Sequence, residues 1–297
     1  MASHPLIFDR GRIRRQQQRT RNRIQDHNFL INWNLEAIID RLGDIKRSFP
    51  RILLIGSRHD PILKKKLAQA TRSELMIITD ACHDDHISVR MDEEFICFAP
   101  STFDLIVSPF SLHCVNDVPG TLIQMRRILK PDGLLLAAFP GGDSLIELRQ
   151  SFMKAEISLR GGAQMRVHPF IDKQQAATLM QRAGYALPVV DAERLTVTYD
   201  NAFRLMQDLR GMGETRALHM GESGMTGKAL MMTMARTYQN DFSENGGRVK
   251  ATFEMVFLSG WAPHESQQQP LRPGSAQSRL AAALGTTEYG TGDIPRS

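Results

Sequence analysis

The apolar residues of this chain form short continuous runs, and the segments between the runs have helical periodicity. The runs cover residues 52–55, 75–79, 103–107 and 134–139. Continuous apolar runs of this length are typical of strands buried on both faces of a parallel sheet. The segments 61–70 and 118–129 between them have the apolar spacing of helices. Strands alternating with helices predict right-handed βαβ units, an α/β fold whose mostly parallel sheet is covered by helices on both faces.

The segments after residue 140 continue this alternation. Helices are expected at residues 143–159, 173–183, 201–209 and 227–238. Strands are expected at residues 185–190, 195–199 and 251–261. One further amphipathic helix is expected before the first strand, at residues 28–42, because apolar residues recur there at three- and four-residue steps.

These patterns divide the chain into three parts. We expect a basic N-terminal helical arm over residues 1–50 and a domain over residues 51–263. The remainder, residues 264–297, is rich in Gln, Pro, Gly, Ser and Thr, with a short helical patch at residues 279–284. Segments of this composition bury too little apolar surface to fold, so we expect a mostly disordered tail.

Arginines are concentrated in the N-terminal arm. No acidic residue interrupts the run of Arg10, Arg12, Arg14, Arg15, Arg19, Arg21 and Arg23. The run is either a solvated helix face or an arm that binds a phosphate, an acidic protein or nucleic acid. No aromatic residue lies within it, which disfavours nucleic acid because stacking on bases needs aromatic rings. A protein substrate or a carrier protein, bound through the arm or the tail, is the partner that we expect.

Composition restricts the compartment and the class of protein. The 297 residues carry a net charge of +5, and no run of about 18 apolar residues indicates a membrane span. The arginine-rich start lacks the apolar core of a signal peptide, and it is predicted to be the first helix rather than a transit peptide. The three cysteines, Cys82, Cys97 and Cys114, are far apart. We interpret them as reduced thiols of a cytoplasmic protein.

Candidate ligand-binding residues follow the predicted strands. In an open parallel sheet, ligands bind beyond the carboxyl ends of the strands, where the strand order reverses. Residues 56–60, Asp80 and residues 108–113 lie in such loops. A carboxylate at the position of Asp80 accepts hydrogen bonds from both hydroxyls of a ribose, although an Asp after a strand is also common as a turn residue.

Metal chemistry is not expected from the sequence. Residues 82–86 carry Cys, His and Asp side chains close together. They lack the spacing of known zinc motifs, so we interpret the segment as a polar loop and expect no metal. We interpret His113 as a structural or site-lining histidine rather than a general base.

Several segments resemble class I S-adenosylmethionine-dependent methyltransferases. Residues 126–134 resemble the helix-to-fifth-strand signature of that family, and residues 100–113 resemble its fourth-strand region. Within the class, the chain is similar to the malonyl-carrier-protein methyltransferase-like group that includes the mitochondrial complex I assembly factor. Segments 8–10, 145–149 and 251–254 carry this likeness. The resemblance implies a Rossmann-like fold with a mostly parallel seven-stranded sheet.

The resemblance also implies a set of cofactor-binding residues. Gly56 matches the first glycine of the family's cofactor loop, and Asp80 matches its ribose-binding acid. Asp92 and Glu93 match the acidic position near the adenine amine. Ser108 and His113 line the loop beside the methionine portion and the acceptor. No residue matches a catalytic role, so the catalytic residue stays unknown.

The cofactor loop departs from the family pattern. The family has an acid followed by Gly-x-Gly-x-Gly, whereas residues 54–60 read LIGSRHD and keep only the first glycine. Arg58 stands at the second glycine position, where it either obstructs the cofactor or pairs with the cofactor's carboxylate. Binding of S-adenosylmethionine is therefore an open question. The alternative function is a non-methylating assembly or interaction factor, or a protein-arginine hydroxylase-like protein, for a respiratory complex.

Overall fold

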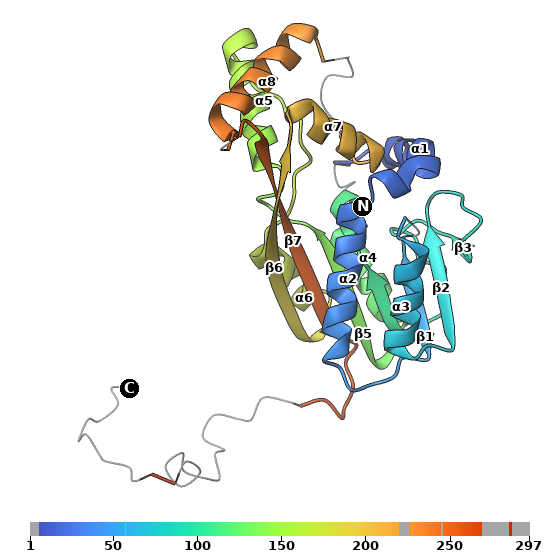
Figure 1. Ribbon diagram of the computed structural model, residues 1–297. Helices are drawn as coiled ribbons and strands as arrows, with labels where there is room; N and C mark the ends of the chain where they lie inside the picture. The colour runs from blue at the N-terminus through green and yellow to red at the C-terminus, as the bar shows by residue number, and fades with distance from the viewer. Residues whose placement is uncertain (1–5, 57, 220–225, 245, 269–284, 287–297) are drawn as a thin grey trace. The chain divides into compact units, whose positions relative to one another are not determined.

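The computed structural model describes residues 6–56, 58–219, 226–244, 246–268 and 285–286 (Figure 1). Residues 1–263 form one compact unit, and residues 264–297 form a second. Most of the tail that we expected to be disordered, including the helical patch at 279–284, lies outside the described residues. Its described residues, 264–268 and 285–286, contain no helix or strand.

A seven-stranded sheet forms the centre of the first unit, in the order β3-β2-β1-β4-β5-β7-β6. The strands are β1 (Arg51–Ile55), β2 (Leu75–Asp80), β3 (Val89–Arg90), β4 (Phe103–Ser108), β5 (Leu129–Pro140), β6 (Ala186–Tyr199) and β7 (Val249–Trp261). The first five pair in parallel, and β7 pairs antiparallel with both β5 and β6. The mostly parallel seven-stranded sheet is thus confirmed. The strand order reverses between β1 and β4, so their carboxyl ends border the crevice where such sheets bind ligands.

Helices cover both faces of the sheet, as predicted (Figure 1). They are α1 (Arg10–Thr20), α2 (Phe29–Gly43), α3 (Pro61–Thr71), α4 (Val118–Ile128), α5 (Ile146–Arg160), α6 (Lys173–Arg182), α7 (Ala202–Gly211) and α8 (Lys228–Phe242). Two short 3-10 helices, η1 (Arg21–Asp26) and η2 (Leu112–Cys114), connect them. Alternate residues of β1 divide between two cores: Leu54 packs with α2 and α3, and Leu53 packs with α4 and α6. The period of two in a strand produces this division.

Polar residues fix where two of these helices begin. The Oδ1 atom of Asp60 accepts a hydrogen bond from the backbone N–H of Ile62 at 2.7 Å, and Pro61 follows in the first turn of α3. At α6, Asp172 and Gln175 form a capping box. Both arrangements satisfy backbone N–H groups that have no partner within the helix. Asp60, at the end of the modified loop, is therefore a helix cap.

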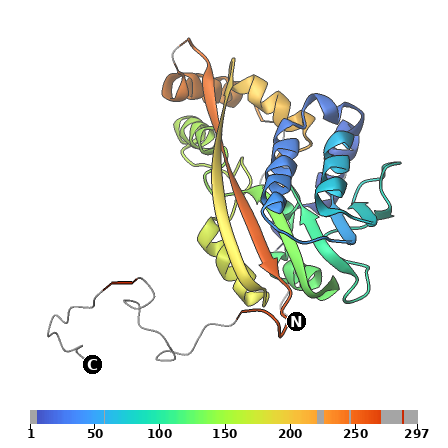
Figure 2. The ribbon, with the colours of Figure 1, turned by 60° about the horizontal axis from the view of Figure 1, so that its bottom comes forward.

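Three details differ from the sequence predictions. The predicted strands at 185–190 and 195–199 are one strand, β6, which runs beside β7 as a long twisted pair (Figure 2). Because β7 offers backbone partners along its whole length, polar Asp191 and Glu193 stay in the strand. Strand β5 begins at Leu129 rather than at residue 134, and the two-residue strand β3 was missed.

The described helices include none that is both long enough and apolar enough to cross a lipid bilayer. Each of the three cysteines is a free thiol, with Cys82 and Cys114 buried and Cys97 exposed.

Candidate functional site

Three predicted site residues meet where strands β1, β2 and β4 end. Gly56 follows β1 with φ at +99°, and its N–H donates to the carbonyl of Thr79 at 2.7 Å. Only glycine adopts this φ without strain, which explains why this glycine of the loop is present. Asp80 ends β2 with 6% of its surface exposed. Ser108 ends β4, fully buried, with its Oγ 2.6 Å from that of Ser111.

Gly56 and Asp80 line a small cavity of about 20 Å³. Glu93 and His113 line it too, together with Ser111 rather than Ser108. The other side of the cavity is formed by α1, through Arg10, Ile13, Arg14 and Gln17. A volume of this size holds about one water molecule.

Arg10 attaches α1 to this edge. Its Nη2 atom donates to Asp92 at 2.7 Å and to Glu93, and its Nη1 atom donates to the carbonyl of Cys114 at 3.1 Å. Burial alone would lower the pKa of Arg10, but the two carboxylates outweigh it and raise that pKa. Arg14 adds a longer contact, 3.5 Å from Asp92. The two predicted adenine-side acids therefore lie together, and both bind the basic arm.

Arg58 is buried beside the same cavity and binds a carboxylate that the sequence did not reveal. Its Nη1 atom donates to Glu214 Oε1 at 2.9 Å and to the carbonyl of Met212 at 2.8 Å. Its guanidinium also lies 6.0 Å from the ring centroid of Phe110. Burial lowers the pKa of Arg58, yet Glu214 and Asp80 outweigh it and raise that pKa.

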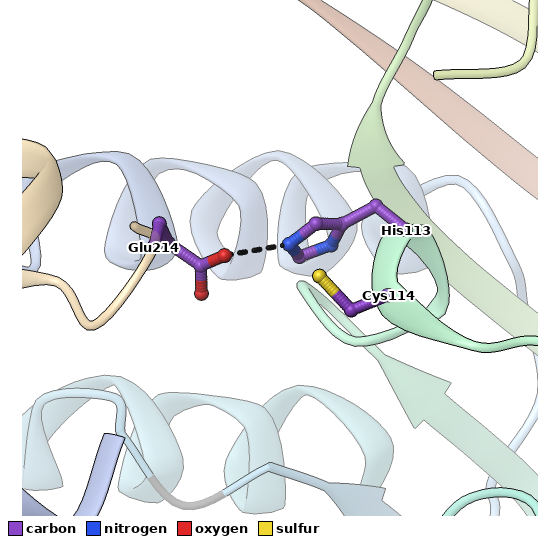
Figure 3. Close-up of side chains that lie close together, drawn as sticks. All are labelled: His113, Cys114 and Glu214. Carbon is purple, nitrogen blue, oxygen red and sulfur yellow. Dashed lines mark hydrogen bonds and ion pairs between the residues drawn. The ribbon is translucent and has the colours of Figure 1, made fainter. Parts of the chain in front are cut away.

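His113 and Cys114, on η2, meet Glu214 from the loop after α7 (Figure 3). His113 Nε2 lies 2.9 Å from Glu214 Oε2. Burial opposes ionisation of both His113 and Glu214. Attraction to the negative Cys114 and Glu214 nevertheless raises the pKa of His113 to about 10. Attraction to His113 and Arg58 lowers the pKa of Glu214. We therefore treat His113 as an imidazolium that, with Arg58, neutralises one buried carboxylate.

Cys114 has a second histidine neighbour. Its Sγ atom lies 3.7 Å from His168 Nδ1, and His168 Nε2 accepts the backbone N–H of Ala217 at 2.9 Å. Because Nε2 of His168 accepts a hydrogen bond, it carries no proton, and the proton of the ring is on Nδ1. The Nδ1–H group of His168 therefore donates to the sulfur. Burial raises the pKa of the Cys114 thiol, but His113 and His168 outweigh it and lower the value to about 7.

Metal-ligating side chains converge here rather than at residues 82–86. Ligand atoms of His113, Cys114 and Glu214 lie within 4.8 Å of one another. Glu214 is already bound by Arg58 and His113, so we treat the group as a cluster of ion pairs. In the segment 82–86, Asp84 pairs with Arg21, and the Cys82 thiol donates to the carbonyl of Arg14 at 3.4 Å. The side chains of residues 82–86 thus contact the N-terminal arm.

A cavity of about 610 Å³ lies on the other side of the cluster. Phe110 and His113 line both it and the small cavity. Helices α5, α7 and α8 provide much of its apolar wall, through Phe152, Met206, Leu209 and Met231. Its volume falls in the range of small-molecule sites.

Sequence reasoning missed Glu214 and the pairing of Arg10. Glu214 is 101 positions from His113 and 156 positions from Arg58. It lies in a loop without periodicity, so no local signal indicated it. The arginine run left open a solvated helix face or an arm that binds an anionic partner, and it did not indicate the two acids of the same chain that Arg10 contacts.

The chain is similar to known methyltransferases and to proteins named as an arginine-hydroxylase. A model of a methyltransferase domain matches residues 28–188. The arginine-hydroxylase NDUFAF5, mitochondrial, of Danio rerio is 31% identical over 287 residues, covering 93% of this chain and 88% of that protein. The malonyl-[acyl-carrier protein] O-methyltransferase of Gallionella capsiferriformans is 30% identical over 177 residues, covering 60% of this chain and 58% of that protein. The match to NDUFAF5 of Dictyostelium discoideum spans only 43% of that relative's length.

The fold has a similar solved structure. A candidate methyltransferase from Bacillus halodurans C-125 has a TM-score of 0.50 at 14% identity, covering 77% of this chain and 98% of that one. At that identity the likeness concerns the fold alone. The domain match and the relative covered over most of its length establish the family. The chain therefore belongs to the class I S-adenosylmethionine-dependent methyltransferases, in the group that contains NDUFAF5 and the malonyl-carrier-protein methyltransferases.

Proposed function

We propose that this protein is an S-adenosylmethionine-dependent methyltransferase whose cofactor site is closed by helix α1 until the cofactor binds. The observation that carries the proposal is the set of groups at the sheet edge: Gly56 with positive φ, the Asp80 carboxylate, and Asp92 with Glu93. Family membership supports S-adenosylmethionine as the cofactor. Asp80 would accept hydrogen bonds from the ribose, and Asp92 with Glu93 would face the adenine amine.

The chemistry of these residues fits the cofactor, but the space between them does not hold it as the side chains lie. About 20 Å³ is free, whereas ligands of this size occupy sites of several hundred Å³. Arg10, Arg14 and Gln17 of α1 fill that side of the site. Binding therefore requires α1 to move and Arg10 to release Asp92 and Glu93.

The acceptor would occupy the 610 Å³ cavity, with His113 between it and the cofactor edge. The bound cofactor supplies an electrophilic methyl group. The chain's own part is to hold the acceptor in line with that group and to exclude water. His113, already an imidazolium, is a positioning residue here rather than a base.

A second function is favoured by the closed site. Arg58 pairs with Glu214 and Arg10 pairs with Asp92, and these ion pairs keep the cofactor site closed. A chain with a closed cofactor site would serve as an assembly or interaction factor without methyl transfer. The name of the NDUFAF5 relatives supports adding an arginine-hydroxylase-like activity to this alternative. We propose a respiratory complex as the assembly on which such a factor would act. The partner would be an acidic protein, a protein substrate or a carrier protein that meets the arm or the tail. We propose a cytoplasmic location and no nucleic-acid partner.

Equilibrium dialysis with radiolabelled S-adenosylmethionine tests the proposed function. We expect the native protein to bind the cofactor and Asp80→Asn to bind it about 10-fold more weakly, because a charge-assisted hydrogen bond contributes about 1.5–3 kcal/mol. Asp85→Asn, in the neighbouring exposed loop, is the matched control and should bind as the native protein does. Failure of the native protein to bind at millimolar cofactor would contradict the proposal and favour the assembly function.

A further inference from the structure

Cys114 is a buried nucleophile that the proposed methyl transfer does not use. Its Sγ atom accepts the Nδ1–H group of His168 at 3.7 Å, and the backbone N–H of Ala217 fixes the other nitrogen of that ring at 2.9 Å. The ring of His168 also meets Phe8 edge-on, with 5.2 Å between the ring centroids. The side chain of His113 lies within 4.8 Å of the same sulfur (Figure 3). Both histidines favour the thiolate, which is the nucleophilic form of cysteine.

The small cavity is the place where a reactant can meet this sulfur. Cys114, His113 and Gly56 are among the residues that line its volume of about 20 Å³. A space of this size holds about one water-sized molecule. Elsewhere Cys114 packs in an apolar cluster with Phe8, Ile13, Ala217 and Leu218. A small reactant therefore fits beside the sulfur in the closed site, whereas a large one does not.

His113 brings an unused proton to the same cavity. Its Nε2 atom lies 2.9 Å from Glu214, whereas its buried Nδ1 atom has no hydrogen-bond partner within the part of the chain that the structure describes. Because an imidazolium carries a proton on both nitrogens, Nδ1–H is a donor without an acceptor. One cavity is thus lined by a nucleophilic sulfur and by a free proton donor. Reduction of a small oxidant needs these two groups together.

We propose that Cys114 is a peroxide-reactive thiol, which hydrogen peroxide oxidises to a sulfenic acid in the small cavity. The thiolate sulfur attacks one peroxide oxygen, so that an S–O bond forms and the O–O bond breaks. The sulfur is oxidised and the peroxide is reduced. The departing hydroxide takes the Nδ1 proton of His113 and leaves as water. The products are a sulfenic acid, water and a neutral imidazole, and no cofactor takes part.

Mass spectrometry of the native, full-length protein after a pulse of hydrogen peroxide at pH 7 tests this proposal. Catalase stops the reaction, and dimedone in denaturant then labels the sulfenic acid at each cysteine. We expect Cys114 to be oxidised at least 10-fold faster than the exposed Cys97, because His113 and His168 favour its thiolate and His113 protonates the departing oxygen. Cys82 is the matched buried control. Burial first, and then Asp80, raise the pKa of Cys82 to about 11, so it should stay unlabelled.

His168→Phe provides a second test. Phenylalanine keeps a ring beside Phe8 but has no N–H group for the sulfur, so oxidation of Cys114 should slow about 10-fold while that of Cys97 stays the same. His83→Phe, in the exposed loop after β2, is the matched control and should be oxidised as the native protein is.

Three results would overturn the proposal. They are oxidation of Cys114 no faster than that of Cys97, oxidation of Cys82 as fast as that of Cys114, and an unchanged rate at Cys114 in a folded His168→Phe protein. The comparison of the three cysteines needs no variant, so it decides the matter if His168→Phe does not fold. Because these reactions contain no S-adenosylmethionine, their failure is distinguishable from failure of methyl transfer.

Discussion

Replacing Glu214 by Gln is expected to lower the free energy of unfolding by about 3–5 kcal/mol, the range for breaking a buried ion pair from one side. Glu214 binds Arg58 at 2.9 Å and His113 at 2.9 Å. Both partners have side chains no more than 10% exposed. The amide would leave two buried cations without the carboxylate that both contact. Denaturant titration of the two proteins at neutral pH measures the loss.

The pH dependence of this difference has a defined sign. Burial raises the pKa of Glu214, but His113 and Arg58 outweigh it and leave the value below the ordinary 4.5. A carboxyl whose pKa is lower in the folded state contributes stability above its unfolded value and loses it as the pH falls through the folded value. The advantage of the native protein over Glu214→Gln should therefore be full between pH 4.5 and 6.5 and shrink in more acidic solution. It should also shrink as the pH rises toward about 10, because the imidazolium of His113, whose pKa Glu214 helps to raise, then loses its proton.

Asp241→Asn is the matched control for this experiment. Asp241 pairs with Lys154 at 2.8 Å on the surface, where both side chains are at least one third exposed. Exposed pairs contribute about 0–1 kcal/mol, so this variant should unfold almost as the native protein does. If Glu214→Gln lost no more stability than Asp241→Asn, the buried cluster would not be the ion-pair group described here.

Replacing Glu156 by Gln is expected to lower the free energy of unfolding by a similar amount, about 3–5 kcal/mol. The Glu156 side chain is fully buried on α5. One of its oxygens accepts two hydrogen bonds from Arg166, and the other accepts the backbone N–H of Gln164 at 2.6 Å. Its loss would leave the Arg166 guanidinium without its carboxylate in a largely buried position.

A double-mutant cycle separates this pair from a general packing effect. The variant Glu156→Gln with Arg166→Gln should recover part of the loss, because no unpaired charge then remains. Additive effects of the two single substitutions, measured by the same denaturant titration, would show that Glu156 and Arg166 do not stabilise each other.

The arrangement of the sheet followed from local patterns, whereas the site depended on contacts between distant segments. Continuous apolar runs indicated β1, β2, β4 and β5, because a strand buried on both faces needs an apolar side chain at every position. Strand β6 was predicted as two strands because the mostly polar residues in its middle, 191–194, have the composition of a turn. They are tolerated in the strand because β6 lies at the edge of the sheet. Its continuity depends on pairing with β7, which no local pattern encodes.

The modified cofactor loop illustrates the same limit. The sequence showed that Arg58 replaces a glycine and left two alternatives, obstruction of the cofactor or pairing with it. The structure adds a third alternative, in which Arg58 pairs with Glu214, 156 positions away in the sequence. Likewise, Asp92 and Glu93 were predicted as cofactor-side acids, but their contacts with Arg10 could not be read from either segment alone. Charges paired over such separations become visible only in the folded chain.

The central claim, that α1 closes the cofactor site through Arg10, is tested most directly by the affinity of Arg10→Gln for S-adenosylmethionine. Calorimetric titration compares this variant with the native protein and with Arg15→Gln, an exposed arginine of the same helix. If binding must first release Arg10 from Asp92 and Glu93, weakening those contacts raises the population of the open state and tightens binding, by about 10-fold or more. Arg15→Gln should bind as the native protein does. Equal or weaker binding by Arg10→Gln would contradict the account.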